Sequence, residues 1–354
     1  MCGSRGFVAS QIARVYLLLL PSMRVLVSGG AGFIGSHFVK RLLAGGDEVV
    51  VLDKLTYSGN RANLPGDVEL FEGDIAEPEH VARAARGCAA IVNFAAETHV
   101  DRSILRAEDF GRAEFRGTQV LLEHVLTAGI RLVQVSTDEV YGDLEEGGSA
   151  TEDYPLRPSS PYSAAKAAGD LLVPAYVRTF QVDASVTRGS NTYGPNQYPE
   201  KFIPLFVTNA LDGDPLPLYG DGRQVRDWLF VEDHCAGIEL VLREGSAGEI
   251  YNIGGGDERE NIEVAEKLLE LTGADRSLLR SVADRPGHDR RYSLDTGKLH
   301  ALGWEPAKDF AEGVRETVEW YRDNRLWWEP IKSGEYRAYY ERQYADRLAK
   351  ATPV

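Results

Sequence analysis

The stretch RVLVSGGAGFIGSHFVKRLLA, residues 24–44, decides the fold. It opens with a short apolar run, which is typical of a buried strand. The run Gly29-Gly30-Ala31-Gly32-Phe33-Ile34-Gly35 follows at once and leads into a predicted helix. Glycines at such a turn let the backbone approach a pyrophosphate, and the helix N-terminus supplies free N–H groups. The stretch therefore predicts a strand–turn–helix unit that binds a dinucleotide.

A carboxylate at the end of the second predicted strand points to the identity of that dinucleotide. Asp53 follows the strand Glu48–Leu52, about twenty residues beyond the glycine turn, where a carboxylate can accept hydrogen bonds from both ribose hydroxyls. The same charge repels a 2′-phosphate, which favours NAD over NADP, although the adjacent Lys54 weakens that preference. Asp74 either borders the adenine or is an ordinary carboxylate at a strand end. His37 is expected to be a packed side chain rather than a catalytic one.

The first half of the chain alternates strands with helices, which predicts βαβ units and a doubly wound parallel sheet of the Rossmann type. The predicted strands are Arg24–Ser28, Glu48–Leu52, Val68–Glu72, Ala90–Phe94, Arg131–Ser136 and Ala184–Arg188. The predicted helices are Phe33–Ala44, Pro78–Arg86, Ser103–Ala128 and Pro161–Phe180. Beyond about Asn191 the pattern becomes irregular and rich in Gly, Pro and aromatic residues, which predicts a smaller substrate-binding lobe.

These patterns divide the chain into four parts. We expect a leader over residues 1–22, a nucleotide-binding lobe over 23–190, a substrate lobe over 191–332 with the chain crossing between lobes, and a polar surface tail over 333–354. The leader holds an apolar run that is shorter than the h-region of a signal peptide, so a disordered or over-annotated segment before Met23 is the favoured interpretation.

Composition restricts the partners and the compartment. The 354 residues carry a net charge of −15, which argues against non-specific binding to nucleic acid or to an anionic membrane. An anionic substrate therefore needs a local basic pocket. The three cysteines are far apart and lack metal-ligand spacing, so they are expected to be reduced thiols in a cytoplasmic protein. No metal site is expected.

Tyr162 and Lys166 form the first candidate catalytic group. Ser160-Pro161 is a typical helix start, and four residues separate the tyrosine from the lysine, so both side chains lie on one face of the helix. A nearby ammonium lowers the pKa of a phenol, so we expect Tyr162 to serve as a base near neutral pH.

A pair of adjacent carboxylates forms the second group. Thr137, Asp138 and Glu139 end the fifth predicted strand, at the sheet edge where ligands bind. Two carboxylates in one site have their pKa values pushed apart, which makes one an acid and the other a base. A solvated acidic loop is the alternative interpretation, and the neighbouring tyrosine and cofactor favour chemistry.

These motifs together resemble the extended short-chain dehydrogenase/reductases, and within them the dTDP-glucose 4,6-dehydratases. The resemblance runs from about Met23 to Lys332. Besides the glycine turn and the Tyr162–Lys166 pair, it rests on DKLTYSGN (53–60), NFAAETHVDRSI (93–104), STDEVYG (136–142), NTYGPNQYPEKFIP (191–204), YGDGRQVRDWLFVEDH (219–234) and DRPGHDRRY (284–292). The Thr-Asp-Glu triplet is the most discriminating motif, because related 4-epimerases typically lack the carboxylate pair.

The resemblance implies a lyase that uses NAD as a catalytic cofactor and dTDP-glucose as substrate. Tyr162 would take the proton of the sugar 4-hydroxyl during oxidation at C4, with Thr137 bonded to the oxygen at C4. Glu139 would then remove the C5 proton, Asp138 would protonate the departing 6-hydroxyl, and reduction at C6 would regenerate NAD. The product would be a 4-keto-6-deoxy sugar nucleotide.

The resemblance also assigns binding residues. The cofactor would contact Gly29, Gly32, Phe33, Ile34, Gly35, Asp53, Lys54, Thr56, Asp74, Ile75, Ala95, Ala96, Tyr162 and Lys166. The substrate would contact Thr98, Asn191, Lys201, Pro217, Tyr219, Arg226, Asn261, Arg285 and His288. Among these, Arg226 and Arg285 would neutralise the diphosphate.

Two positions, Glu114 and Pro174, carry residues that are unexpected in a chain that resembles this family. The family usually has Asn where Glu114 stands, so the helix packing or the proton relay is expected to differ there. Pro174 falls inside the predicted catalytic helix and is expected to kink it, at a typical cost of roughly 3 kcal/mol. In this family that helix and Ser103–Ala128 commonly form a four-helix interface, which implies a homodimer.

Three other functions remain as alternatives. A nucleotide-sugar 4-epimerase or a UDP-glucuronate decarboxylase shares the first oxidation, but neither reaction expels a 6-hydroxyl, so Asp138 argues against both. A GDP- or CDP-sugar dehydratase differs only in the pocket for the base. A non-catalytic NAD-binding protein of the same fold would be expected to have lost Tyr162, Lys166 or the carboxylates, and none is missing.

Overall fold

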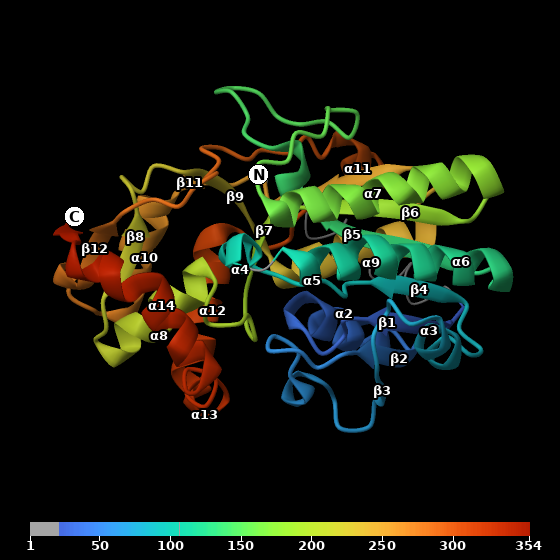
Figure 1. Ribbon diagram of the computed structural model, residues 1–354, viewed down its shortest axis with the longest axis horizontal. Helices are drawn as coiled ribbons and strands as arrows, with labels where there is room; N and C mark the ends of the chain where they lie inside the picture. Colours follow the sequence, from blue (N-terminus) through green and yellow to red (C-terminus); the bar gives the residue numbers. More distant parts are fainter. Residues whose placement is uncertain (1–20, 106) are drawn as a thin grey trace, which may run out of the picture.

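A parallel sheet of seven strands forms the first lobe of the molecule (Figure 1). The computed structural model describes residues 21–105 and 107–354. The strands lie in the order β10-β6-β5-β4-β1-β2-β3, and every neighbouring pair is parallel. They are β1 (Arg24–Ser28), β2 (Glu48–Asp53), β3 (Glu69–Glu72), β4 (Ala90–Asn93), β5 (Arg131–Thr137), β6 (Ala184–Gly189) and β10 (Ile250–Ile253). The doubly wound parallel fold predicted from the sequence is confirmed.

Helices cover both faces of this sheet. Successive side chains of a strand point to opposite faces, so Val25 and Val27 pack with α2 and α9, whereas Leu26 packs with α3, α6 and α7. The bounds of these helices are α2 (Phe33–Ala44), α9 (Val231–Glu244), α3 (Pro78–Ala84), α6 (Thr118–Ala128) and α7 (Pro161–Phe180). Helix α7 continues through Pro174 to Phe180. The two faces therefore carry separate apolar cores.

The continuous helix predicted over Ser103–Ala128 is wrong. The segment forms α4 (Val100–Leu105), α5 (Glu108–Gly111), a π-helical turn (Arg112–Gly117) and then α6. The π-helical turn packs tightly, since a Cβ added to Gly117 would lie 2.4 Å from Ile75 Cδ1. The break falls at Ala107, before α5, and the chain is helical from Glu108 through the π-helical turn to Ala128. π-Helical turns are rare, and the sequence pattern did not predict this one.

The second lobe has its own core, although the sequence there is irregular in pattern. Trp328, Tyr321 and Phe206 are fully buried in it. Its strands are β7 (Asn191–Tyr193), β8 (Leu216–Tyr219), β9 (Val225–Phe230), β11 (Glu258–Glu260), β12 (Leu279–Val282) and β13 (Thr352–Pro353). Its helices are α8 (Phe202–Asp212), α10 (Asn261–Thr272), α12 (Phe310–Asp323), α13 (Arg325–Trp328) and α14 (Glu335–Ala349). Between them, α9, β10 and α11 (Gly297–Ala301) lie against the first lobe.

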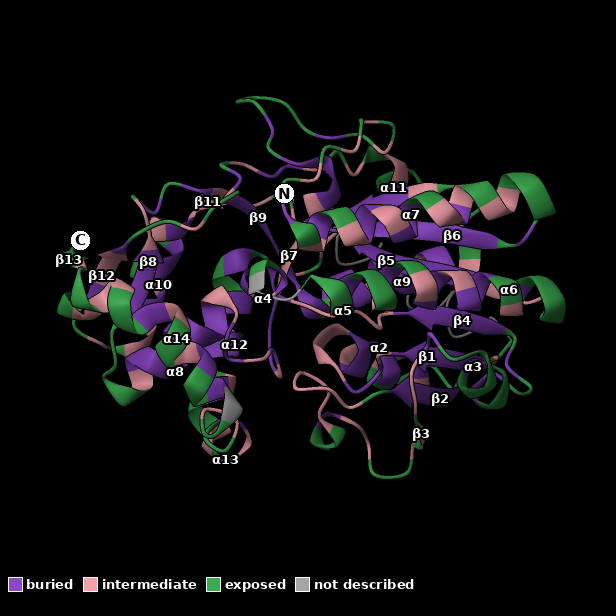
Figure 2. Ribbon diagram, viewed as in Figure 1, coloured by how far each residue is buried: buried purple, intermediate pink, exposed green. Residues whose placement is uncertain are grey.

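The C-terminal segment is a helix that packs against the second lobe rather than only covering its surface. In α14, Tyr336, Tyr339 and Tyr344 are buried, and Figure 2 shows buried and exposed residues alternating along this helix. The leader expected over residues 1–22 lies outside the described residues up to residue 20. Within the described ranges, no helix is both long and apolar enough to cross a bilayer.

Candidate active site

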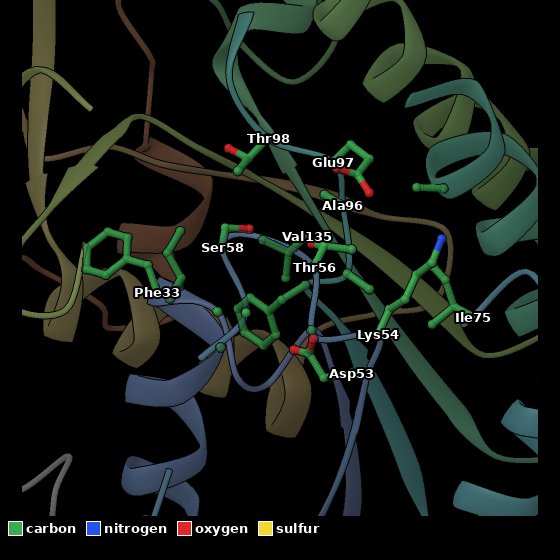
Figure 3. Close-up of a pocket in the computed structure, with 18 of the residues that line it drawn as sticks. Phe33, Asp53, Lys54, Thr56, Ser58, Ile75, Ala96, Glu97, Thr98 and Val135 are labelled. Atoms are coloured by element: carbon green, nitrogen blue, oxygen red, sulfur yellow. The ribbon is translucent and has the colours of Figure 1, made fainter. Parts of the chain in front are cut away.

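A cleft lies at the carboxyl ends of the parallel strands, between the two lobes. Its walls come from the segments after β1, β2, β3 and β4 and from the end of β5, and Gln197, Tyr198 and Lys201 close it from the second lobe. Figure 3 shows Asp53, Phe33 and Thr56 around this space. All the residues that the resemblance assigns to the cofactor line this one cleft. Ligands of open α/β sheets bind at this edge.

The turn between β1 and α2 is packed so closely against its own backbone that two of its positions require glycine. Gly29 has φ +71°, and a Cβ there would lie 2.5 Å from the backbone nitrogen of Ala95. A Cβ on Gly35 would lie 2.3 Å from the carbonyl oxygen of Gly29. Gly32 precedes α2 and offers no side-chain cap, so the first N–H groups of the helix and its positive dipole end remain available to an anion.

The Asp53 carboxylate is held firmly at the end of β2. Its two oxygens accept hydrogen bonds from the backbone N–H groups of Ala31 at 2.9 Å and Leu55 at 2.8 Å. Each carboxylate oxygen has a second lone pair left for a hydroxyl. Burial raises the pKa of this carboxyl above its ordinary value, and the two backbone donors oppose that rise.

The cation next to Asp53 does not favour a 2′-phosphate. Lys54 Nζ lies 3.3 Å from Asp74 Oδ2, and Arg112 lies 3.4 Å from the same oxygen. Asp74 also accepts a hydrogen bond from the Ala76 N–H at 2.8 Å. The bare glycine turn, the uncapped helix and the Asp53 carboxylate together fit NAD.

Helix α7 brings Tyr162 and Lys166 into the same cleft. Ser160 caps the helix, and Ser163 completes a reciprocal capping box, which fixes where the helix begins. The Tyr162 N–H donates to Ser103 Oγ at 3.2 Å, and the Phe110 ring packs edge-on against the Tyr162 ring. The base is therefore held from both α4 and α5.

The expectation that the pKa of Tyr162 is lowered is wrong: the surroundings that the chain itself provides raise it. Burial raises the pKa of this phenol well above its usual value, and four carboxylates, Glu139, Glu114, Asp138 and Asp170, raise it further. The ammonium of Lys166 faces a carboxylate of its own, since Glu114 Oε2 lies 3.2 Å from Nζ. The cationic influence of the lysine on the phenol is therefore outweighed.

The carboxylate pair sits in two different environments. Asp138 is 3% exposed, with Oδ1 accepting from Thr137 Oγ1 at 3.1 Å and Oδ2 without a hydrogen-bond partner among the described residues. Burial and the charge of Glu139 raise the pKa of Asp138 well above its ordinary value. Burial also raises the pKa of Glu139, but Arg285, Lys201 and Arg226 oppose that rise. The first carboxyl is thus favoured as an acid and the second as a base.

Arg285 and Tyr219 form one polar cluster in the second lobe. Asp101 accepts from Arg285 Nη1 at 3.1 Å and from the Tyr219 hydroxyl at 3.0 Å. The Tyr219 ring packs edge-on against His288, which bonds Asp284 at 2.6 Å. Burial lowers the pKa of His288 to about 4. Arg285 links this cluster to the carboxylate pair, because its charge opposes the rise in the pKa of Glu139.

The remaining predicted substrate residues are more dispersed. Arg226 donates to the carbonyl oxygens of Val225 at 2.7 Å and Asp289 at 2.8 Å. The oxygen of the Asn191 side chain is buried without a partner among the described residues. Pro217 and Asn261 lie in β8 and at the start of α10. Thr98 and Lys201 line the main cleft with the cofactor residues.

Sequence reasoning missed several side chains that shape the site. Ser58, Gln197 and Tyr198 line the cleft and lie inside motifs already quoted, so the signal was present. Gln343 donates to Asp101 at 2.9 Å and to the Tyr219 hydroxyl at 2.7 Å. It comes from the polar tail, where no local signal points to the site.

Comparison with known proteins identifies the family. Residues 26–317 match the family described as GDP-mannose 4,6 dehydratase. The chain belongs to this family. It is 55% identical to a dTDP-glucose 4,6-dehydratase of Streptomyces niveus over 324 residues, covering 88% of this chain and 96% of that relative.

Solved structures agree with the 4,6-dehydratase assignment. DesIV, a dTDP-glucose 4,6-dehydratase from Streptomyces venezuelae with NAD bound, matches with a TM-score of 0.85 and 57% identity, covering 88% of this chain and 100% of that one. A UDP-glucose 4-epimerase from Thermus thermophilus in complex with NAD matches with a TM-score of 0.81 and 37% identity, covering 85% and 100%. Since dehydratases and epimerases share the fold, the site has to separate them.

Proposed function

We propose that this chain is a dTDP-glucose 4,6-dehydratase that converts dTDP-glucose to dTDP-4-keto-6-deoxyglucose. The observation that carries the proposal is the pair formed by the buried Asp138 and the partly buried Glu139, whose charges both act on Tyr162. An epimerase needs a base at C4 but no second acid and base. The names of the relatives, at 51–55% identity for the three Streptomyces and Actinoplanes proteins, support the same reaction.

The cofactor assigned to the cleft is NAD. The first turn of α2 would bind the pyrophosphate, Asp53 the adenosine ribose, and Tyr162 and Lys166 the nicotinamide half. When bound, NAD supplies an electron-pair acceptor for C4 and returns the same pair at C6, so none is consumed overall.

The first half of the reaction needs a base at the sugar 4-hydroxyl. Tyr162, as phenolate, takes the hydroxyl proton while C4 is oxidised to a ketone. Because burial and the neighbouring carboxylates raise its pKa, the phenolate needs a compensating positive charge, which a nicotinamide bound beside Tyr162 would supply. Thr137 donates a hydrogen bond to the C4 oxygen and steadies the ketone.

The second half eliminates water across C5 and C6. The ketone acidifies the C5 proton, which Glu139 removes, and the C6–O bond breaks as Asp138 gives its proton to the leaving hydroxyl. The two environments support these roles: burial and the charge of Glu139 raise the pKa of Asp138 and so favour its protonated form, and three cations favour the charged form of Glu139. Glu139 then returns its proton to C5 as C6 is reduced.

The variant Asp138→Asn tests whether Asp138 is the acid and Glu139 the base. Asparagine cannot donate a carboxyl proton, so we expect elimination to slow by roughly 10²–10⁴-fold, while C4 oxidation continues. Rapid mixing with dTDP-glucose should then show reduced nicotinamide accumulating on the enzyme, whereas the wild type should show little. Glu146→Gln, an exposed carboxylate in the following loop, is the matched control. A variant with wild-type turnover and no such accumulation would contradict the role of Asp138.

The nucleotide preference rests on the second lobe. Arg226, Arg285 and Lys201 would offset the diphosphate, which the overall charge of −15 would otherwise repel. Tyr219 and Pro217 would lie near the base. Turnover of UDP-, GDP- or CDP-glucose at a rate equal to that of dTDP-glucose would contradict the proposed preference for a thymine nucleotide.

We also infer a homodimer and a cytoplasmic location. Exposed apolar side chains lie on the π-helical turn, α6 and α7, with Phe115 47%, Leu126 42% and Leu171 61% exposed. These helices lie side by side on one face of the sheet (Figure 1). Burial of such side chains between two copies would remove them from water.

The cytoplasmic location rests on the cysteines. Cys88 and Cys235 are buried free thiols, which suits a reducing compartment.

A further inference from the structure

A buried ion pair joins Lys166, which lines the cleft with Tyr162, to Glu114 of the π-helical turn. Glu114 Oε2 lies 3.2 Å from Lys166 Nζ, and the two side chains are 1% and 6% exposed. The inference drawn from this pair rests on the proposed function, because it takes Tyr162 and Lys166 as the catalytic base and its partner.

Lys166 has a second partner in the sheet. Its ammonium donates to the Val135 carbonyl oxygen at 2.9 Å. An ammonium has three N–H donors, and the Val135 carbonyl accepts one of them, so Lys166 pairs with Glu114 through charge and still lines the cleft. The lysine is therefore held between strand β5 and the π-helical turn.

Close helix packing sets the position of Glu114. A Cβ added to Gly169, one turn after Lys166, would lie 3.0 Å from the Glu114 carbonyl oxygen and 3.2 Å from Thr118 Oγ1. On its other side the π-helical turn packs against Ile75 through Gly117. Helix α7 and the turn are thus in contact where Glu114 meets Lys166, and π-helical turns recur at functional sites.

The carboxylate of Glu114 depends on this lysine. Among the described residues, neither of its oxygens accepts a hydrogen bond. Burial raises the pKa of Glu114 to about 7; Lys166 opposes the rise, and Asp170 and Glu97 add to it. Asp170 is itself paired with Arg188 at 2.8 Å. An unpaired carboxylate in this position would be strongly disfavoured.

Glu114 also belongs to the set of charges that face the base. Tyr162 is subject to Glu139 and Asp138 from the strand end, to Glu114 from the π-helical turn and to Asp170 from its own helix. Each of these negative charges raises the pKa of the phenol. Glu114 is the one that is tied directly to the catalytic lysine.

We propose that Glu114 is a positioning residue for Lys166: with the Val135 carbonyl it fixes the ammonium beside the base, and its charge helps to set the pH range in which Tyr162 works. Position and charge can be separated by substitution. Gln keeps an oxygen of similar reach for the ammonium but removes the charge. Leu removes both.

The kinetic test compares Glu114→Gln, Glu114→Leu and the control Glu123→Gln, which removes an exposed charge from the next helix. For Glu114→Gln we expect the acid limb of the kcat/KM profile to move to lower pH by roughly half a unit or more, because one negative charge near the phenol is gone. For Glu114→Leu we expect kcat to fall by about tenfold or more with KM little changed. The control should match the wild type. An unshifted profile for Gln together with wild-type kcat for Leu would overturn the proposal.

A second readout needs neither substrate nor cofactor. A carboxyl with a raised folded-state pKa stabilises the protein most below its unfolded pKa, and that contribution is lost as pH rises through the folded value. Wild type should therefore lose stability between about pH 5 and pH 8 through Glu114, and Glu114→Gln should not. The Tm of the variant minus that of the wild type should rise over this range, with no such trend for Glu123→Gln.

The two readouts separate two kinds of failure. A wild-type protein that does not turn over dTDP-glucose would contradict the proposed function, and the thermal comparison would still decide the inference about Glu114. A Tm difference that stays constant with pH would show that Glu114 does not ionise next to Lys166 in the folded protein, and would overturn the inference even in an active enzyme.

Discussion

At the residue scale, the proposed preference for NAD rests on Asp53, whose carboxylate is held by two backbone hydrogen bonds. Because Ala31 and Leu55 hold its oxygens, the carboxylate needs no rearrangement to accept ribose hydroxyls. For Asp53→Asn we expect the Kd for NAD to rise by about tenfold to a hundredfold, the value of a hydrogen bond to a charged group. The preference for NAD over NADP should shrink in the same variant.

Calorimetric titration of NAD and NADP into both proteins checks this expectation. Glu72→Gln, an exposed carboxylate at the end of the neighbouring strand β3, serves as the control and should bind like the wild type. A variant that keeps the wild-type ratio of NAD to NADP affinity would show that another group makes the discrimination.

The pKa of Tyr162 shows what could not be predicted from residues alone. Its spacing from Lys166 predicted a shared helix face, and the structure places both in one cleft. The direction of the pKa shift is set first by burial of the phenol and then by four carboxylates, of which Glu114 and Asp170 approach from the π-helical turn and from α7 itself. That balance of charges depends on burial and distance, which a motif does not contain.

At the element scale, local periodicity predicted six of the seven strands of the first sheet to within one residue at each end. It did not predict the break before α5 or the π-helical turn that follows, which is a rare conformation. It also failed to show that α14 is packed, because the helix buries tyrosines rather than aliphatic side chains. Tyrosine in a charged tail suggests a surface, yet its ring buries as much apolar area as a core residue.

Helix α14 is expected to act on substrate binding. Gln343 bonds both Asp101 and the Tyr219 hydroxyl, so it orders the cluster that holds Arg285. For Gln343→Leu we predict a KM for dTDP-glucose raised by about threefold to tenfold, the value of one or two hydrogen bonds, with kcat nearly unchanged. Steady-state kinetics measure both constants.

The control for this variant is Arg342→Leu, an exposed neighbour on the same helix. Equal effects of the two substitutions would mean that α14 is only destabilised. A fall in kcat with unchanged KM would place Gln343 in the chemistry instead of in binding.

At the scale of the whole molecule, two lobes with separate cores share one cleft. The first lobe could be predicted because its strands and helices alternate locally, whereas β10 joins the sheet only after the chain has passed through the second lobe. The proposed association of two chains into a dimer is also a property of the whole molecule. For Leu171→Glu on α7 we expect the molar mass to fall from twice 39.0 kDa to one chain in light scattering.

Leu326→Glu is the matched control for that prediction. Leu326 is 91% exposed on α13 in the other lobe, so its replacement should leave a dimer intact. A wild-type protein with the mass of a single chain would contradict the inferred homodimer, and a dimer that survives Leu171→Glu would place the interface elsewhere.

The most direct measurement of the central claim is the mass of the sugar nucleotide after incubation of the purified protein with dTDP-glucose and a substoichiometric amount of NAD. We predict conversion to a product lighter by one water, with no net accumulation of reduced cofactor, because the electrons taken from C4 return at C6. A product of unchanged mass that has been epimerised at C4, or no product at all, would contradict the assignment as a 4,6-dehydratase.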